Sequence, residues 1–228
     1  MPAPADNLAA TIDHTLLRPD CTEAQIVQLC QEARAQGFAS ACVPPCYVPV
    51  AARELSNSAV AVCTVIGFPL GYSSARVKFR EAEIALAEGA TELDMVLNVS
   101  LLKSGQLDAV RAEVEDLADL AEVNGALLKV IIETALLTEA EMETAARLCA
   151  EAGAAFVKTS TGFASRGASV ADVELLRRVL PDYVRIKASG GIRTRAQALA
   201  LLAAGADRLG TSNGLAILQN DDEAPTAY

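Results

Sequence analysis

The sequence predicts a single α/β domain that closes into a (β/α)8 barrel, the TIM-barrel architecture, and three observations support this. The chain has 228 residues, the usual size of one such barrel. Short apolar runs alternate with segments of helical periodicity, as parallel strands covered by helices do. The composition is 52% hydrophobic and the mean hydropathy is +0.28, yet no apolar stretch is long enough to span a membrane.

A glycine recurs where each helical run ends and the next apolar run begins. These glycines are Gly37, Gly89, Gly125, Gly153 and Gly205. Glycine just past a helix end adopts the left-handed conformation that stops the helix. Gly37 and Gly89 are 52 residues apart, as are Gly153 and Gly205, which corresponds to two βα units of about 26 residues each.

Seven strands are predicted from the apolar runs at 40–43, 60–66, 92–97, 127–132, 156–159, 184–188 and 207–210. Helical apolar spacing separates them at 76–87, 109–122, 139–150, 170–179 and 195–203. A closed barrel requires an eighth strand, which is assigned to 10–17 and is followed by a helix starting at Thr22. The alternative is an open doubly wound sheet, which is disfavoured because no G-x-G-x-x-G fingerprint follows the first strand.

Residues 1–220 are therefore expected to form the barrel domain, and 221–228 a flexible polar tail that ends in Tyr228. The N-terminus lacks the basic start and apolar core of a signal peptide, which predicts a cytoplasmic protein. A net charge of −10 argues against a nucleic-acid partner but permits small phosphorylated substrates.

The cysteines and the single histidine, His14, do not form a recognisable metal site, because no C-x-x-C pair occurs among the six cysteines. We interpret the cysteines as reduced and mostly buried thiols. Cys42 lies near the end of a predicted strand, and it would react with unsaturated aldehydes only if it opened into the barrel mouth.

Charged residues occur at the predicted strand ends, where barrel enzymes carry their catalytic groups. Asp94 lies among apolar residues and needs a cation as partner. Lys158 and Lys187 end neighbouring strands about 5 Å apart, so each ammonium disfavours the other. Either lysine fits the role of an amine nucleophile. The alternative is a structural Asp–Lys ion pair, and Lys129 is assigned such a role, with Asp94 or Glu133 as its partner.

Two glycine-rich turns predict a phosphate site. SGGIRT (189–194) follows the seventh strand of the barrel, and GTSNG (210–214) follows the eighth and opens a short helix at 215–219. Loops in these positions form the recurrent phosphate site of such barrels, because glycines let backbone N–H groups approach the anion. Two ordinary tight turns are the alternative interpretation.

With these residues in view, the chain resembles the deoxyribose-phosphate aldolase family of class I, Schiff-base-forming aldolases. The resemblance runs from IDHTLL (12–17) to GTSN (210–213) and includes VIGFPLG (65–71), ELDMVLN (92–98), LKVIIET (128–134), FVKTSTG (156–162) and IKASGGIR (186–193). It implies a cytoplasmic homodimeric lyase that reversibly cleaves 2-deoxy-D-ribose 5-phosphate to D-glyceraldehyde 3-phosphate and acetaldehyde. No cofactor or metal is implied, because the protonated imine serves as the electron sink.

The resemblance also implies residue roles. Lys158 would form the Schiff base, Lys187 would lower its pKa and relay protons, and Asp94 would be the general acid and base. The implied substrate contacts are Asp13, Thr15, Thr161, Gly162, Gly190, Gly191, Gly210, Ser212 and Asn213. Some family members carry a second lysine where this chain has Phe163, and a serine where it has Asn213. The family carries a terminal tyrosine that closes over its site, and Tyr228 is either its counterpart or part of an unstructured end, which the composition of the tail favours.

Two other functions remain open at this point. One is a different barrel enzyme acting on a sugar phosphate, such as an isomerase or a dehydratase, which would share the phosphate site without a reactive amine. The other is a barrel that binds a phosphorylated ligand without catalysis.

Overall fold

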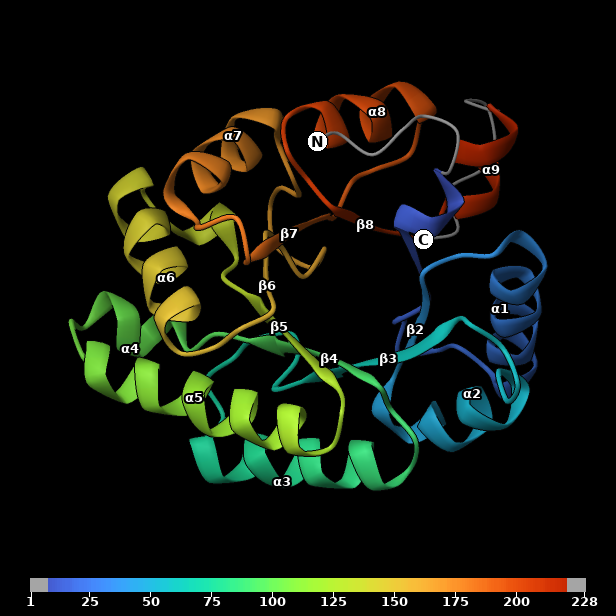
Figure 1. Ribbon diagram of the computed structural model, residues 1–228, viewed down its shortest axis with the longest axis horizontal. Coiled ribbons are helices and arrows are strands. Elements are labelled where there is room, and N and C mark those ends of the chain that lie inside the picture. The colour runs from blue at the N-terminus through green and yellow to red at the C-terminus, as the bar shows by residue number, and fades with distance from the viewer. Residues whose placement is uncertain (1–7, 221–228) are drawn as a thin grey trace.

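The computed structural model describes residues 8–220, and these form one closed barrel of parallel strands in the order of the sequence (Figure 1). The strands are β1 Ile12–Thr15, β2 Ser40–Val43, β3 Ala61–Ile66, β4 Glu92–Val96, β5 Leu127–Ile131, β6 Phe156–Lys158, β7 Arg185–Ser189 and β8 Arg208–Thr211. β1 pairs with both β2 and β8, which closes the sheet. The predicted barrel is confirmed, and so is the assignment of an eighth strand near the N-terminus.

Helices surround this barrel on its outer side (Figure 1). They are α1 Glu23–Gln36, α2 Val48–Glu54, α3 Ala75–Ala87, α4 Val99–Lys103, α5 Leu107–Val123, α6 Glu139–Glu151, α7 Val170–Val179, α8 Arg195–Ala203 and α9 Gly214–Gln219. Helices α2 and α4 were not predicted, because seven and five residues are too short for a helical period to be recognised. Short 3-10 turns occur at Ala9–Thr11, Pro45–Tyr47 and Thr134–Leu136.

The helix ends follow from local chemistry. Thr22 caps α1 through a capping box with Gln25, which confirms the predicted helix start. Gly37 follows α1 with a φ of 67°, and the other four glycines of the helix-to-strand joins also have positive φ. Among residues 8–220, no helix is long and apolar enough to cross a bilayer.

Strand alternation places the charged residues inside the barrel. On β4, Leu93 and Met95 belong to the main apolar core, whereas Glu92 and Asp94 pair with lysines of the barrel interior. Backbone pairing aligns Asp94 with Lys129. The polar site is therefore built on paired strands, and its side chains have little freedom to move apart.

The tail 221–228, with Tyr228, lies outside the described residues. One correction concerns β7, which continues to Ser189, so that Lys187 lies within the strand and does not end it. Lys158, by contrast, is the last residue of β6.

Candidate active site

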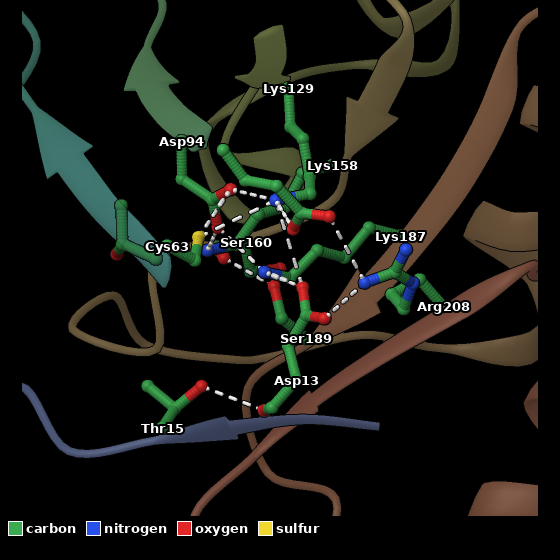
Figure 2. A network of polar contacts seen from close by, with 12 residues as sticks. Asp13, Thr15, Cys63, Asp94, Lys129, Lys158, Ser160, Lys187, Ser189 and Arg208 are labelled. Carbon is green, nitrogen blue, oxygen red and sulfur yellow. Dashed lines mark hydrogen bonds and ion pairs between the residues drawn. The ribbon is translucent and has the colours of Figure 1, made fainter. Parts of the chain in front are cut away.

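Asp94 lies at the centre of a cluster of lysines inside the barrel (Figure 2). Its Oδ2 accepts hydrogen bonds from Lys158 Nζ at 2.7 Å and Lys187 Nζ at 2.6 Å, and its Oδ1 accepts one from Lys129 Nζ at 2.9 Å. The expected cations around Asp94 are thus present. Of the two partners considered for Lys129, Asp94 is correct and Glu133 is wrong, because Glu133 bonds to Thr161 instead.

The cluster extends through two further carboxylates. Asp13 lies 2.5 Å from Lys187 Nζ and accepts a 2.6 Å hydrogen bond from Arg208. Glu92 lies 2.6 Å from Lys129 Nζ and 3.5 Å from Arg208. In the described part of the chain this charge network contains three carboxylates and four cations: Asp13, Glu92, Asp94, Lys129, Lys158, Lys187 and Arg208.

Burial and ion pairing act in opposite directions on these groups, and ion pairing prevails. Burial alone would raise the pKa of Asp94, but Lys129, Lys158 and Lys187 hold that pKa well below its ordinary value. Burial alone would lower the pKa of Lys187, but the carboxylates of Asp13 and Asp94 raise it. Lys187 is therefore a permanent cation beside Lys158.

The barrel mouth contains a cavity of about 320 Å³, and its lining shows which of the two candidate lysines a substrate can reach. Lys158 lines this cavity, whereas Lys187 and Lys129 are fully buried beneath it and do not. The remaining lining residues come from the last residues of β1, β7 and β8 and from the loops after β1, β6, β7 and β8: Thr15, Leu17, Arg18, Pro19, Thr161, Gly162, Phe163, Ser189, Gly190, Gly191, Ile192, Arg193, Gly210, Thr211, Ser212 and Asn213. A substrate bound in this cavity can therefore contact the amine of Lys158 but not that of Lys187.

Most of the predicted substrate contacts line this cavity, namely Thr15, Thr161, Gly162, Gly190, Gly191, Gly210, Ser212 and Asn213. Asp13 does not line it, because its carboxylate is fully buried in the charge network. The sequence reasoning missed Arg18 and Arg193 as lining residues. Arg193 lies inside the predicted turn 189–194 and was recognisable there, but Arg18 follows β1 without a motif that marks it.

Glycine is required where the turns approach each other. Gly190 has a φ of 85°, and a Cβ on it would lie 3.0 Å from Gly167 Cα and 3.3 Å from Gly162 Cα. A Cβ on Gly210 would lie 2.9 Å from Ser189 Cβ. A side chain at either position would push neighbouring segments of the cavity wall apart, so glycine allows the turns to approach each other this closely.

Hydrogen bonds from buried side chains hold the loops in place. Glu133 accepts hydrogen bonds from the Thr161 backbone N–H at 3.1 Å and the Thr161 hydroxyl at 2.5 Å. Ser189 donates to the Ser160 carbonyl at 2.6 Å, which ties the β6 and β7 loops together. The cavity wall is therefore largely formed before a ligand arrives.

Phe163 occupies the position where some members of the family carry a second lysine. Its side chain is 56% exposed. It packs edge-to-face on Phe68, with ring centroids 5.2 Å apart. Cys42 is fully buried and does not line the main cavity, which favours the inert interpretation of this thiol.

Two groups of side chains each place three metal-ligand atoms within 4.8 Å of one another: Cys42, Cys63 and Asp94, and Asp13, Cys63 and Glu92. Their carboxylates are already paired with lysine or arginine. A divalent cation would have to displace one ammonium group and lie beside the others, at a large electrostatic cost. We therefore assign no metal to these groups.

Comparison with known proteins gives the family. The family model described as "DeoC/LacD family aldolase" matches residues 8–221. The chain belongs to this aldolase family. It is 50% identical to the deoxyribose-phosphate aldolase of Brevibacillus brevis over 97% of this chain and 100% of that protein. The corresponding protein of Thermoanaerobacter sp. is 49% identical over 93% of this chain and 96% of its own.

Solved structures agree with the DeoC/LacD assignment. A protein described as "QR15, an Aldolase" superposes with a TM-score of 0.89 at 40% identity, over 94% of this chain and 95% of that chain. The deoxyribose phosphate aldolase of Aeropyrum pernix, described as tetrameric, superposes with a TM-score of 0.88 at 38% identity, over 95% of this chain and 91% of that chain. The resemblance found in the sequence motifs is confirmed.

Proposed function

We propose that the protein reversibly cleaves 2-deoxy-D-ribose 5-phosphate to D-glyceraldehyde 3-phosphate and acetaldehyde through a Schiff base on Lys158. One observation carries the proposal: Lys158 lines the cavity while its Nζ lies 2.7 Å from the carboxylate of Asp94. The names of the aldolase relatives support this choice of reaction.

The proposed nucleophile is the free amine of Lys158, because only an unprotonated amine attacks carbonyl carbon. Lys187 is held by Asp13 and by the same Asp94 oxygen that contacts Lys158. The positive charge of Lys187 repels a second positive charge at this point.

The proposed cleavage begins when the Lys158 amine attacks C1 of the open-chain sugar and the carbinolamine loses water. A base removes the proton of the C3 hydroxyl, the C2–C3 bond breaks, and its electron pair moves into the iminium as an enamine. Protonation at C2 and hydrolysis then release acetaldehyde and restore the amine. Asp94 is the proposed general acid and base, acting through water, and its Oδ2 is already hydrogen-bonded to Lys158.

The proposed phosphate site is the glycine-rich part of the cavity, formed by Gly162, Gly190, Gly191, Gly210 and Ser212, with Asn213 and Thr161 beside it. Among the described residues, the wall carries three cationic side chains and no carboxylate, although the chain as a whole has a net charge of −10. A local excess of positive charge favours an anionic substrate. Thr15 and Asp13 are proposed to interact with the sugar hydroxyl and the charge network.

We also propose that the enzyme acts as a cytoplasmic homodimer, with residues 1–220 as its single domain. These points rest on the family resemblance and on the single closed barrel of the described residues. Light scattering at micromolar protein concentration tests the dimer, and a tetramer like that described for the Aeropyrum pernix relative would contradict it.

Trapping the imine tests the chemistry. The protein is incubated with acetaldehyde and borohydride, and the reduced adduct is located by peptide mass mapping. We expect the adduct on Lys158 and none in Lys158→Ala. The matched control is Lys103→Ala, which removes an exposed lysine paired with Glu141 outside the cavity and should trap normally. Absence of an adduct, or an adduct elsewhere, would support an isomerase, a dehydratase or a binding barrel instead.

A further inference from the structure

Arg18 is a cation of the cavity wall to which the proposed reaction assigns no role. It lies in the loop between β1 and α1, outside both glycine-rich turns. Of the three cationic side chains on the wall, Lys158 is committed to the imine, and Arg193 belongs to the predicted turn 189–194. Arg18 is therefore a separate source of positive charge at this cavity.

Barrel closure places the Arg18 loop beside the proposed phosphate site. β1 pairs with β8, with Asp13 opposite Gly210 and His14 opposite Thr211. The loop after β1 therefore emerges next to the loop after β8, which carries Ser212 and contributes to the same wall. Phe163, by contrast, follows β6, which is two strands away from β8 in the barrel order.

Arg18 forms an ion pair with Asp20, and breaking this pair costs little free energy. Its Nε donates to Asp20 Oδ1 at 2.9 Å and its Nη2 donates to Asp20 Oδ2 at 3.3 Å. The two side chains are 35% and 73% exposed, and ion pairs in water of this kind contribute little to stability. A phosphate dianion can accept the same two guanidinium hydrogen bonds as a carboxylate and carries more negative charge. In the cavity the pair would also be less hydrated than the Arg18–Asp20 pair.

We propose that Arg18 is a specificity residue for the phosphate group, whose guanidinium moves from Asp20 to the phosphate when the substrate binds. The proposal rests on the proposed function, because it names a determinant of the same site. In the free enzyme Asp20 accepts hydrogen bonds from the guanidinium, and it therefore competes with the phosphate for the same N–H donors.

The test compares kcat/KM for 2-deoxyribose 5-phosphate and for unphosphorylated 2-deoxyribose. In Arg18→Gln we expect the ratio of the two values to fall about tenfold, mainly through KM, as loss of a charge-assisted hydrogen bond implies. Arg18→Lys keeps the charge without the fork and should fall in between. Asp20→Asn removes the competitor and should raise the ratio about twofold.

The matched control is Arg53→Gln, because Arg53 is also an exposed arginine paired with acidic neighbours, Glu54 and Glu23, but lies on α2 outside the cavity. Its ratio should equal that of the wild type. A ratio within twofold of the wild type in Arg18→Gln would overturn the proposal, and so would an equal loss with both substrates.

Calorimetric titration with inorganic phosphate gives a second readout that needs no turnover. We expect Arg18→Gln to weaken phosphate binding at least fivefold and Arg53→Gln to leave it unchanged. Unchanged binding in Arg18→Gln would refute the role of Arg18, whatever the reaction. Failure of acetaldehyde trapping in the wild type would instead refute the proposed function, so the two failures are distinguishable.

Discussion

Replacing Lys187 with leucine removes one of the four cations of the charge network and leaves its three carboxylates in place. Asp13 retains Arg208 at 2.6 Å, and Asp94 retains Lys158 at 2.7 Å. In the wild type the positive charge of Lys187 opposes protonation of Lys158, and the variant lacks this repulsion. We therefore expect the variant to lose its nucleophile at neutral pH.

The size of the effect follows from the geometry at Asp94. Lys158 and Lys187 both contact its Oδ2, at 2.7 Å and 2.6 Å, so their Nζ atoms are at most about 5 Å apart. At an effective dielectric constant of about 20, two unit charges at that distance repel by about 3 kcal/mol. This energy corresponds to about two pH units. The activity of Lys187→Leu at neutral pH should therefore fall about a hundredfold.

The assay is the rate of 2-deoxyribose 5-phosphate cleavage measured between pH 6 and pH 10. The acidic limb of the pH–rate profile should move upward by about two units, so that activity is recovered in alkaline solution. The matched control is Lys78→Leu, because Lys78 is also fully buried and donates to Glu113 at 2.9 Å, away from the cavity. Breaking either buried pair should destabilise the protein by about 3–5 kcal/mol, but only Lys187→Leu should shift the profile.

Two results would refute this reasoning. The first is a folded Lys187→Leu variant whose activity is low at every pH and whose profile keeps its wild-type midpoint. The second is an equal shift of the profile in Lys78→Leu, which would mean that loss of stability moves the profile. Far-UV circular dichroism and thermal denaturation of both variants establish that they are folded at the assay temperature.

Two other predictions concern the phosphate turns and acid stability. Gly190→Ala should raise the KM for the phosphorylated substrate about tenfold and lower the free energy of unfolding by about 1–2 kcal/mol. The reason is that φ at this position is 85° and the new Cβ would lie 3.0 Å from Gly167 Cα. An unchanged KM would contradict the proposed phosphate site. The folded-state pKa values of Asp13 and Asp94 lie below their ordinary value of 3.8, so the stability they contribute is fully present above that pH and is lost as the pH falls through the folded values. Thermal melts from pH 2 to pH 7 should show a level melting temperature down to about pH 4 and a decline below it that is shallower in Asp13→Asn.

Much of the fold was predictable because its signals are local. Apolar runs identified the strands, the range 40–43 agrees with β2, and the helix 170–179 agrees with α7. Thr22 and the positive-φ glycines marked helix ends through interactions within a few residues. Helices α2 and α4 escaped prediction because each is too short to show a period.

The candidate site was predictable only in part. Motifs in single segments identified Asp94, Lys158 and Lys187, and their places on the predicted strands indicated that they gather at the catalytic end of the barrel. No local pattern indicated that Arg208 and Glu92 complete the charge network, or that Arg18 lines the cavity. These relations join strands and loops that are distant in the chain, and only closure of the barrel brings them together.

The barrel, its glycine-rich turns and a pair of lysines on neighbouring strands could all be predicted from the residues alone. The sequence left the choice between Lys158 and Lys187 to the family resemblance, because residue type and strand position are the same for both. The tertiary structure separates them: β6 ends at Lys158, which reaches the cavity, whereas β7 continues past Lys187, which stays buried between Asp13 and Asp94. The two lysines are register partners on β6 and β7, so the surroundings of each side chain, and not its position along the strand, decide which amine meets the substrate.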